Sequence, residues 1–417
     1  MRTASRILHS PTLSVLFAGL LSAALFVGPA LAGDDEGAVR LLKTIPIPGA
    51  ALHGFDISWV DESTQRYYLA DRSNAAVDVI DAKTDTFITQ IKGGFAGVKF
   101  NAAGAANNDI SGPTGVVTSG RWLFVTDAPS RVVTIDLTTK LIVSDVKTSA
   151  TEPTRADELA YDPESGTILA VNNAADPPFA TLIKVNKATG ALTVGQRITF
   201  DASGGVVATN GAEQPVWDSS TRKFYISIPE VGGVTANGAV ARIDLHSTGM
   251  VDAVFPVQFC QPAGLTLGPR QDLLIGCSVA FDTAGNVWSA ADPNTAAPIS
   301  VIMDAKNGSI DRQVTGVSAS DEVWFNRGDG RYYLAARNQP GGPVLGVIDA
   351  KSQTLVQLVP TINVGGKAFV FPSGTAHSVA ANPHNNHVYV PLAANNVVPY
   401  CLNGCIAVFG APKHDDD

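Results

Sequence analysis

Residues 54–86 read GFDISWVDESTQRYYLADRSNAAVDVIDAKTDT, and residues 321–354 read DEVWFNRGDGRYYLAARNQPGGPVLGVIDAKSQT with nearly the same layout. Each copy contains a short strand, a polar turn, a strand rich in aromatic and β-branched residues, a turn with Asn or Gly, and a strand that ends in Ile-Asp. A sequence motif repeated within one chain is typical of folds built from structural repeats. The number of its copies therefore predicts the fold.

The same order of strands and turns occurs in seven units. Their anchor positions are Asp56, Thr114, Asp157, Gln214, Gln261, Asp321 and His377. Successive anchors lie 43 to 60 residues apart, which is the range of a four-stranded propeller blade with loop insertions. Helical periodicity is almost absent. The sequence therefore predicts an all-β fold, a seven-bladed β-propeller of four-stranded antiparallel blades over residues 40–410.

The two ends of this region predict how the ring closes. Residues 40–47 read RLLKTIPI and precede the first unit without a partner of their own, while the last unit ends at Phe409 one strand short. A sheet edge left open is a site of aggregation, and closure of the ring removes it. We therefore expect the N-terminal strand to complete the last blade.

A family resemblance supports this interpretation. The segment YYLADRSNAAVDVIDAKTDT, residues 67–86, resembles the repeat of YVTN-type seven-bladed β-propellers, and the resemblance extends with decreasing strength over residues 40–410. This broad group includes lactonase-like and gluconolactonase-like hydrolases, a streptogramin lyase, and many exported propellers thought to be binding or surface proteins. The resemblance implies the fold, but a shared scaffold does not transfer any of these activities.

The N-terminal residues 1–32 read as a secretory signal peptide, with a basic start, an apolar stretch from Leu13 to Val27 and an Ala-Leu-Ala ending at Ala32. A retained membrane anchor is the alternative, but the apolar stretch is short for a span of about 20 residues. Cleavage would remove Arg2 and Arg6, so the net charge would change from −9 to −11. We expect a periplasmic or secreted monomer without a membrane span after cleavage, with a flexible segment at 33–39 and an acidic tail at 411–417.

The net negative charge argues against nucleic acid as a partner, because phosphate neutralisation needs clustered Lys and Arg. The four cysteines, in a chain with an export signal, indicate oxidising conditions. Cys260 and Cys277 bracket two segments that read as successive strands of one sheet, and Cys401 and Cys405 frame the turn LNG. We predict two disulfides with these pairings. A CxxxC metal or redox site is the alternative, but neither pair has the His or Cys companions of a zinc site.

Polar residues mark the start of the first strand in most units. The innermost strands of a propeller line a central channel, so these residues should converge from every blade at one mouth. Alignment on the turn after each first strand places five residues in one column, Asp56, Asp157, Gln214, Asp321 and His377, with Thr114 and Gln261 in the other two blades. Adjacent to this column are His53, Glu158, Glu213 and Glu322.

We assign roles to these residues as follows. The catalytic candidates are His377, Glu322, Asp321 and Glu158, and the candidate ligands of a divalent metal ion (calcium, magnesium or a transition metal) are Asp56, Asp157 and Glu213. The substrate-binding candidates are His53, Thr114, Gln214 and Gln261, together with Lys99 and Lys367 in Gly- and Ala-rich insertions expected over the mouth. Like charges gathered there would repel one another unless a cation, a shared proton or a water network relieved them.

Two functions remain open. The first is a metal-assisted enzyme acting on a small polar molecule at the mouth, with hydrolysis of a lactone or ester as the reaction and a lyase reaction close behind. The second is a non-catalytic propeller that binds a protein, a glycan or a metal ion. A purely structural role of the polar column, in which these side chains join one blade to the next, stands beside both. No G-x-S-x-G or phosphate-binding Gly-rich motif is present, which argues against a nucleophile elbow and a nucleotide cofactor.

Overall fold

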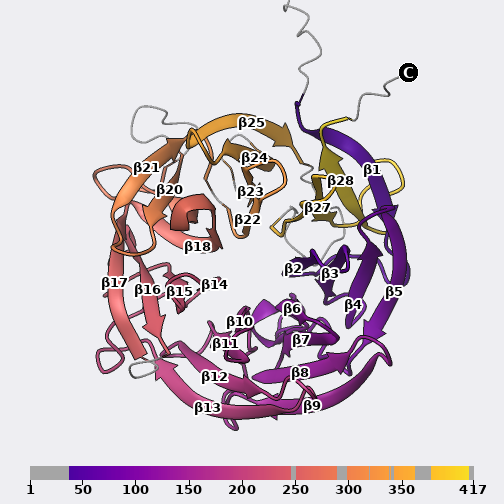
Figure 1. Cartoon of the computed structure of the whole chain (residues 1–417), viewed down its shortest axis with the longest axis horizontal. Coiled ribbons are helices and arrows are strands. Elements are labelled where there is room, and N and C mark those ends of the chain that lie inside the picture. Colours follow the sequence, from indigo (N-terminus) through magenta and orange to yellow (C-terminus); the bar gives the residue numbers. More distant parts are fainter. Residues whose placement is uncertain are drawn as a thin grey trace, which may run out of the picture. The chain divides into compact units, whose positions relative to one another are not determined.

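The computed structural model describes residues 37–245, 250–288, 298–318, 320–337, 339, 342–361 and 377–412. These residues form seven four-stranded antiparallel sheets that follow one another around a ring (Figure 1). The predicted seven-bladed propeller is confirmed. The only helical segments in the described ranges are two short 3-10 turns, η1 (Asn108–Ile110) and η2 (Pro269–Gln271), and no helix there could cross a membrane. The expected signal peptide, Lys367 and most of the acidic tail lie outside the described residues.

The blades follow the chain, and within each blade the first strand lies nearest the ring axis (Figure 1). The strands of blades 1 to 3 are β2 (Ser58–Asp61), β3 (Arg66–Asp71), β4 (Ala76–Asp81) and β5 (Thr86–Lys92); β6 (Val116–Ser119), β7 (Trp122–Asp127), β8 (Arg131–Asp136) and β9 (Leu141–Lys147); β10 (Leu159–Asp162), β11 (Thr167–Asn172), β12 (Phe179–Val185) and β13 (Leu192–Thr199).

The next blades repeat this arrangement. The strands of blades 4 to 6 are β14 (Pro215–Asp218), β15 (Lys223–Ile228), β16 (Asn237–Asp244) and β17 (Met250–Gln258); β18 (Cys260–Leu267), β19 (Asp272–Ala280), β20 (Ile299–Asp304) and β21 (Ile310–Thr315); β22 (Val323–Asn326), β23 (Arg331–Ala336), β24 (Val344–Asp349) and β25 (Thr354–Pro360). Blade 7 consists of β26 (Ala380–Asn382), β27 (His387–Leu392), β28 (Cys405–Gly410) and β1 (Arg40–Pro46).

The N-terminal strand closes the ring, as predicted. β1 pairs with β28 in antiparallel register from Arg40 opposite Gly410 to Pro46 opposite Cys405. Ile45 of β1 is only 3% exposed and packs in a cluster that joins blade 7 to blade 1. The pairing of β1 thus covers the edge of β28, joins the two ends of the chain and buries apolar surface.

Adjacent tyrosines show how neighbouring blades pack. Successive residues of a strand point to opposite faces of its sheet, and both faces of a blade are covered by other blades. Tyr67 packs toward blade 7, with its ring 5.1 Å from the ring of Tyr389, while Tyr68 belongs to the cluster shared with blade 2. Both tyrosines are fully buried. The aromatic second strands are therefore core, as their sequence indicates.

Both predicted disulfides are present. Cys260 of β18 is bonded to Cys277 of β19 across the antiparallel pair, and the two Cα atoms lie 5.2 Å apart. Cys401 is bonded to Cys405 across the turn before β28, with Cα atoms 4.9 Å apart. No described cysteine is free.

A matched pair of substitutions tests the closing strand. Ile45→Ala should lower the free energy of unfolding by about 2–5 kcal/mol, because it deletes a buried side chain at the ring seam. Leu41→Ala, in the same strand but 42% exposed, should cost less than about 0.5 kcal/mol. Urea unfolding of both variants measures the difference. Equal losses would show that β1 does not seal the ring.

Candidate functional site

Backbone hydrogen bonds fix the register of the polar column. Asp56, Asp157, Glu213 and Asp321 each donate their N–H to a carbonyl of the second strand of their own blade, and the same bond begins at Thr114 in blade 2. These residues are therefore equivalent in the fold. The prediction that Gln214 belongs to this column is wrong by one position, since Gln214 is equivalent to Glu158 and Glu322. Both Glu213 and Gln214 are polar, so the residue pattern could not distinguish them, whereas strand pairing does.

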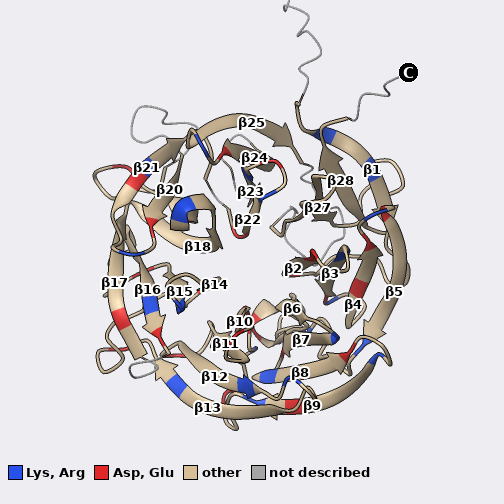
Figure 2. Ribbon diagram, in the orientation of Figure 1, with Lys and Arg blue, Asp and Glu red and all other residues tan. Residues whose placement is uncertain are grey.

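Three arginines neutralise three carboxylates of this column. The pairs are Arg72 with Asp56, Arg155 with Asp157 at 2.8 Å, and Arg337 with Asp321 at 3.0 Å between charged atoms. Figure 2 shows acidic segments beside β2, β10 and β22 on the inner side of the ring. Together with Glu213 and His377, these six side chains form what we call the mouth layer.

The sequence contained a signal for two of these arginines that our sequence analysis did not use. Arg72 follows YYLAD and Arg337 follows YYLAA, at the same position of the duplicated phrase. Each lies just after the second strand of its blade and pairs with the Asp before the first strand. Arg155 has no such counterpart in the repeat. The duplication therefore predicts two Arg–Asp pairs once the strands are known to be neighbours.

His377 makes two contacts that fix its ring in the mouth layer. Its Nε2 lies 3.3 Å from Asp56 Oδ1, and its ring stacks on Phe55 with centroids 4.8 Å apart and planes 9° from parallel. Asp56 is in turn bound by the buried guanidinium of Arg72. Burial acts to raise the pKa of Asp56, but Arg72 and His377 together hold it below its usual range. Asp56 is therefore an anion that orients the imidazole.

Other carboxyl groups near the axis are biased toward the neutral form. Burial, with the nearby carboxylates of Asp157 and Asp321, raises the pKa of Glu213 to about 8. Burial also raises the pKa of Glu158 well above its usual value, and Glu322 adds to the effect. Burial likewise raises the pKa of Glu322 well above its usual value. One oxygen of Glu322 accepts a hydrogen bond of 3.2 Å from the Val379 N–H. Anions and neutral acids thus coexist in one small region.

Three predicted substrate-binding residues have contacts or surroundings outside the mouth layer. Thr114 is fully buried, and its hydroxyl bonds the Ala156 carbonyl at 2.6 Å, so it joins blade 2 to blade 3. The Gln261 amide donates to the Thr235 carbonyl at 3.1 Å. Lys99 is exposed and lines a separate surface pocket.

His53 and Glu213 have different surroundings. His53 is half-buried, its backbone N–H bonds the Ser73 hydroxyl at 2.9 Å, and burial lowers its pKa. Glu213 contributes to a polar pocket of about 450 Å³ between blades 3 and 4, whose wall also includes Asp109, Asn173 and Thr209. Because Asp109 is paired with Arg155 at 3.2 Å, this pocket adjoins the mouth layer and could admit a small polar molecule.

The metal hypothesis finds no support in the described ranges. No group of three or more His, Cys, Asp or Glu side chains is arranged there to hold a metal ion. The two Asp ligands that the sequence suggests, Asp56 and Asp157, are each occupied by an arginine. The arginine guanidinium groups already supply the positive charge that a metal ion would bring to the carboxylates. Asp56 and Asp157 therefore do not fit a metal centre.

Comparisons with known proteins place the fold only. No protein family and no curated protein matches the chain. Among solved structures, Kuenenia stuttgartiensis hydrazine synthase is similar, with a TM-score of 0.60 and 13% sequence identity over 86% of this chain and 95% of that chain. A likeness at this identity shows a shared fold and leaves the reaction of this chain open.

The ion pairs at the mouth should differ in their importance for stability. Arg72→Met should lower the free energy of unfolding by about 3–5 kcal/mol, because it leaves the buried Asp56 carboxylate without its partner. Arg337→Met should cost less than about 1 kcal/mol, since the Arg337 side chain is 38% exposed. Equal effects in urea unfolding would contradict this assignment of buried and solvated pairs.

The raised pKa of Glu213 predicts a pH-dependent stability. Between about pH 4.5 and 8 the folded protein keeps a proton that the unfolded chain has lost, so the wild type should lose stability as pH rises through this window. Glu213→Gln removes this loss. Its free energy of unfolding relative to wild type should increase with pH by up to about 1.4 kcal/mol per pH unit.

The control for this experiment is Glu164→Gln, which removes an exposed carboxyl group. Its stability relative to wild type should change far less with pH than that of Glu213→Gln, because the Glu164 side chain is 61% exposed and its ion pair with Arg222 lies at the surface. A flat difference for Glu213→Gln as well would mean that Glu213 ionises normally.

Proposed function

We propose that the protein is an enzyme that acts on a small polar molecule at the channel mouth by general acid–base catalysis, and that the reaction is hydrolysis of a lactone or ester. The observation that carries this proposal is the His377–Asp56 pair, in which an imidazole is fixed by a carboxylate anion at the ring axis. A base oriented by a third group is a recurring arrangement in acyl transfer. The exposed fraction of the His377 side chain, 13%, leaves it open to a substrate.

His377 serves as the general base. With Nε2–H donating to Asp56, Nδ1 carries the lone pair that can accept a proton from water. Stacking on Phe55 and the anchoring of Asp56 by Arg72 restrict the orientation of the ring. Such restriction keeps the accepting nitrogen in place at the moment of reaction.

Glu213 and Arg337 supply the complementary groups. Glu213, with a pKa of about 8, carries a proton at neutral pH and is suited to protonate a leaving alkoxide. Arg337 is close enough to lower the pKa of Glu213 by its charge, and it is the most exposed of the three mouth-layer arginines. Its guanidinium is suited to stabilise a developing oxyanion.

The reaction balances with these residues alone. Water oxygen attacks the carbonyl carbon as its proton passes to His377 Nδ1, and the carbonyl oxygen becomes an oxyanion beside Arg337. The intermediate collapses, the bond between carbon and leaving oxygen breaks, and Glu213 protonates that oxygen. The proton on His377 then returns to Glu213 through solvent. No step is routed through a metal ion, since arginines pair with two of the three suggested ligands, Asp56 and Asp157.

We also propose that the protein works outside the cytoplasm, in the periplasm or as a secreted protein. The two disulfides support this, because such bonds persist in oxidising compartments. The YVTN-type repeat resemblance is compatible with this placement.

A matched pair of histidine variants tests the catalytic assignment. His377→Gln should lower kcat/KM for a responsive lactone or aryl ester by about 10²- to 10⁴-fold, because it removes the general base. His387→Gln is the control, since His387 also pairs with an Asp, with Nδ1 3.0 Å from Asp85 Oδ2, but joins blade 7 to blade 1. It should reduce stability and spare activity.

The outcome of a substrate screen decides between the competing functions. Turnover should survive EDTA, because the proposed chemistry needs no metal ion. Activity that EDTA abolishes and a divalent metal restores would favour the metal-assisted alternative. An absence of turnover across lactones and aryl esters, with tight binding of a protein, glycan or metal ion, would instead favour the non-catalytic propeller.

A further inference from the structure

A second cavity lies between the first strands and is distinct from the mouth layer. It has a volume of about 360 Å³ and is lined by residues of β2, β6, β10, β14, β18 and β22. None of the mouth-layer side chains contributes to its wall. It extends along the first strands to Pro163, an exposed residue in the turn after β10, so it can be reached without passing the mouth.

The cavity wall is rich in indole rings. The chain has 5 tryptophans, and Trp59, Trp217 and Trp324, from three different blades, line this one cavity. Trp59 and Trp324 occupy equivalent places in the duplicated phrase and meet edge to face, with centroids 5.2 Å apart. They come from blades 1 and 6, and Trp324 packs against the apolar cluster that joins blade 7 to blade 1. Three half-buried indoles around one space are more than core packing requires.

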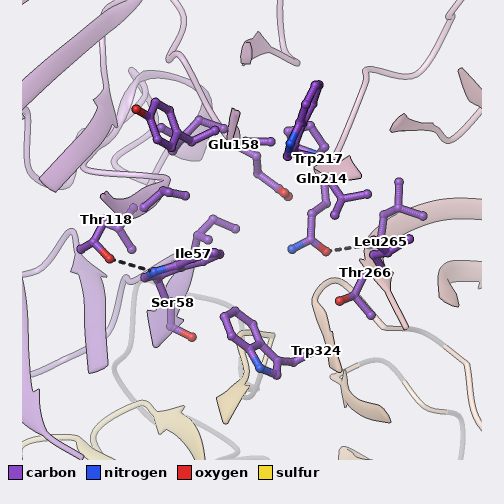
Figure 3. Close-up of a pocket in the computed structure, with 18 of the residues that line it drawn as sticks. Ile57, Ser58, Thr118, Glu158, Gln214, Trp217, Leu265, Thr266 and Trp324 are labelled. Atoms are coloured by element: carbon purple, nitrogen blue, oxygen red, sulfur yellow. Dashed lines mark hydrogen bonds between the residues drawn. The ribbon is translucent and has the colours of Figure 1, made fainter. Parts of the chain in front are cut away.

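Two polar side chains enter this aromatic space. Glu158 is only 7% exposed, and no hydrogen bond to its carboxyl occurs within the described residues. Gln214 accepts a hydrogen bond of 2.6 Å from the Leu265 N–H through its amide oxygen, which leaves its NH₂ group toward the cavity. Figure 3 shows the Glu158 carboxyl and the Gln214 amide directed into the space between Trp217 and Trp324. A buried carboxyl without a partner is costly unless something binds it.

Carboxyl groups surround the cavity, and no basic side chain lines it. Glu158 is affected by the carboxyls of Glu322, Asp157, Glu213 and Asp321. No Lys or Arg is among the residues that line the cavity. The mouth-layer arginines are engaged with Asp56, Asp157 and Asp321, so Glu158 and Glu322 have no cationic partner in the described ranges.

We propose that this cavity binds a small organic cation of the methylated or quaternary ammonium class, with its charge beside Glu158 and its methyl groups against the three tryptophans. Indole faces attract cations, and a cage of aromatic rings is the usual means of recognising quaternary ammonium groups. A ligand of this kind has apolar surface for the indoles and positive charge for the carboxyl. A hydrated metal ion offers no apolar surface, and an anion would be repelled. The proposal does not depend on the hydrolase proposed for the mouth.

A pair of nearly isosteric probes tests the proposal on the full-length protein. Choline carries a quaternary nitrogen, and 3,3-dimethylbutan-1-ol has a carbon in its place. We expect saturable quenching of tryptophan fluorescence and a calorimetric signal with choline and with tetramethylammonium, and at least about tenfold weaker binding of the alcohol. Equal or tighter binding of the alcohol would overturn the proposal and indicate a neutral ligand. No saturable binding of either ammonium compound would also overturn it.

The pH dependence gives an independent readout. A cation favours the carboxylate form of Glu158, so its affinity should rise with pH through the titration of that carboxyl. The carboxyl groups of Glu322, Asp157, Glu213 and Asp321 also act on Glu158. If Glu158 causes the rise in affinity with pH, the rise should be absent from the variant Glu158→Gln. A neutral hydrogen-bonding ligand would instead bind less tightly as the carboxyl ionises, and that trend would refute the proposal.

Variants complete the test. Glu158→Gln should weaken choline binding about tenfold or more, and Trp217→Leu should weaken it roughly threefold to thirtyfold. Glu164→Gln, which removes an exposed charge of the same chain segment, should leave the affinity unchanged. His377→Gln should bind choline like the wild type. Loss of hydrolysis therefore tests the mouth layer, and loss of choline binding tests the cavity, independently of each other. Unchanged choline binding in Glu158→Gln, with the fold shown intact by its melting curve, would contradict the assignment.

Discussion

The pairing of β1 with β28 is the constraint on which the rest of the structure depends. The last blade has four strands only because β1 completes it, and this strand comes from the opposite end of the described chain. Closure turns the first strand of every blade toward one axis. Residues that are 43 to 60 positions apart in sequence thereby become neighbours in one small volume.

This convergence creates an electrostatic problem that the arginines solve in part. The described strand starts bring together the carboxyl groups of Asp56, Asp157, Glu158, Glu213, Asp321 and Glu322, and such a cluster is unstable if every member is ionised. Arg72, Arg155 and Arg337 neutralise three of them. The others are shifted toward the protonated form. The same region thus holds an oriented base, neutral acids and guanidinium groups, which is the chemistry we propose for the mouth.

The first strands also separate two environments along the axis. Their starts carry charged residues, and their later positions carry Trp59, Trp217 and Trp324 around a cavity. Glu158 and Gln214 stand at the junction, one position after the column of ion-paired residues. A strand alternates its side chains between two faces, so neighbours such as Asp157 and Glu158 can belong to different sites. This explains how one ring can present a polar mouth and an aromatic cavity without an additional domain.

The sequence by itself determined the number of blades, the closing strand and the disulfide pairs, because each depends on local strand patterns and on spacing along the chain. It also indicated which strand starts are polar. Tertiary structure alone decided that Glu213 and not Gln214 belongs to the charged column, since register depends on strand pairing. It also decided that Arg72 and Arg155 pair with Asp56 and Asp157, two of the three carboxylates for which a metal ion was expected. The repeat marks the position of Arg72 in the sequence, but its partner depends on strand pairing and on the packing of the blades.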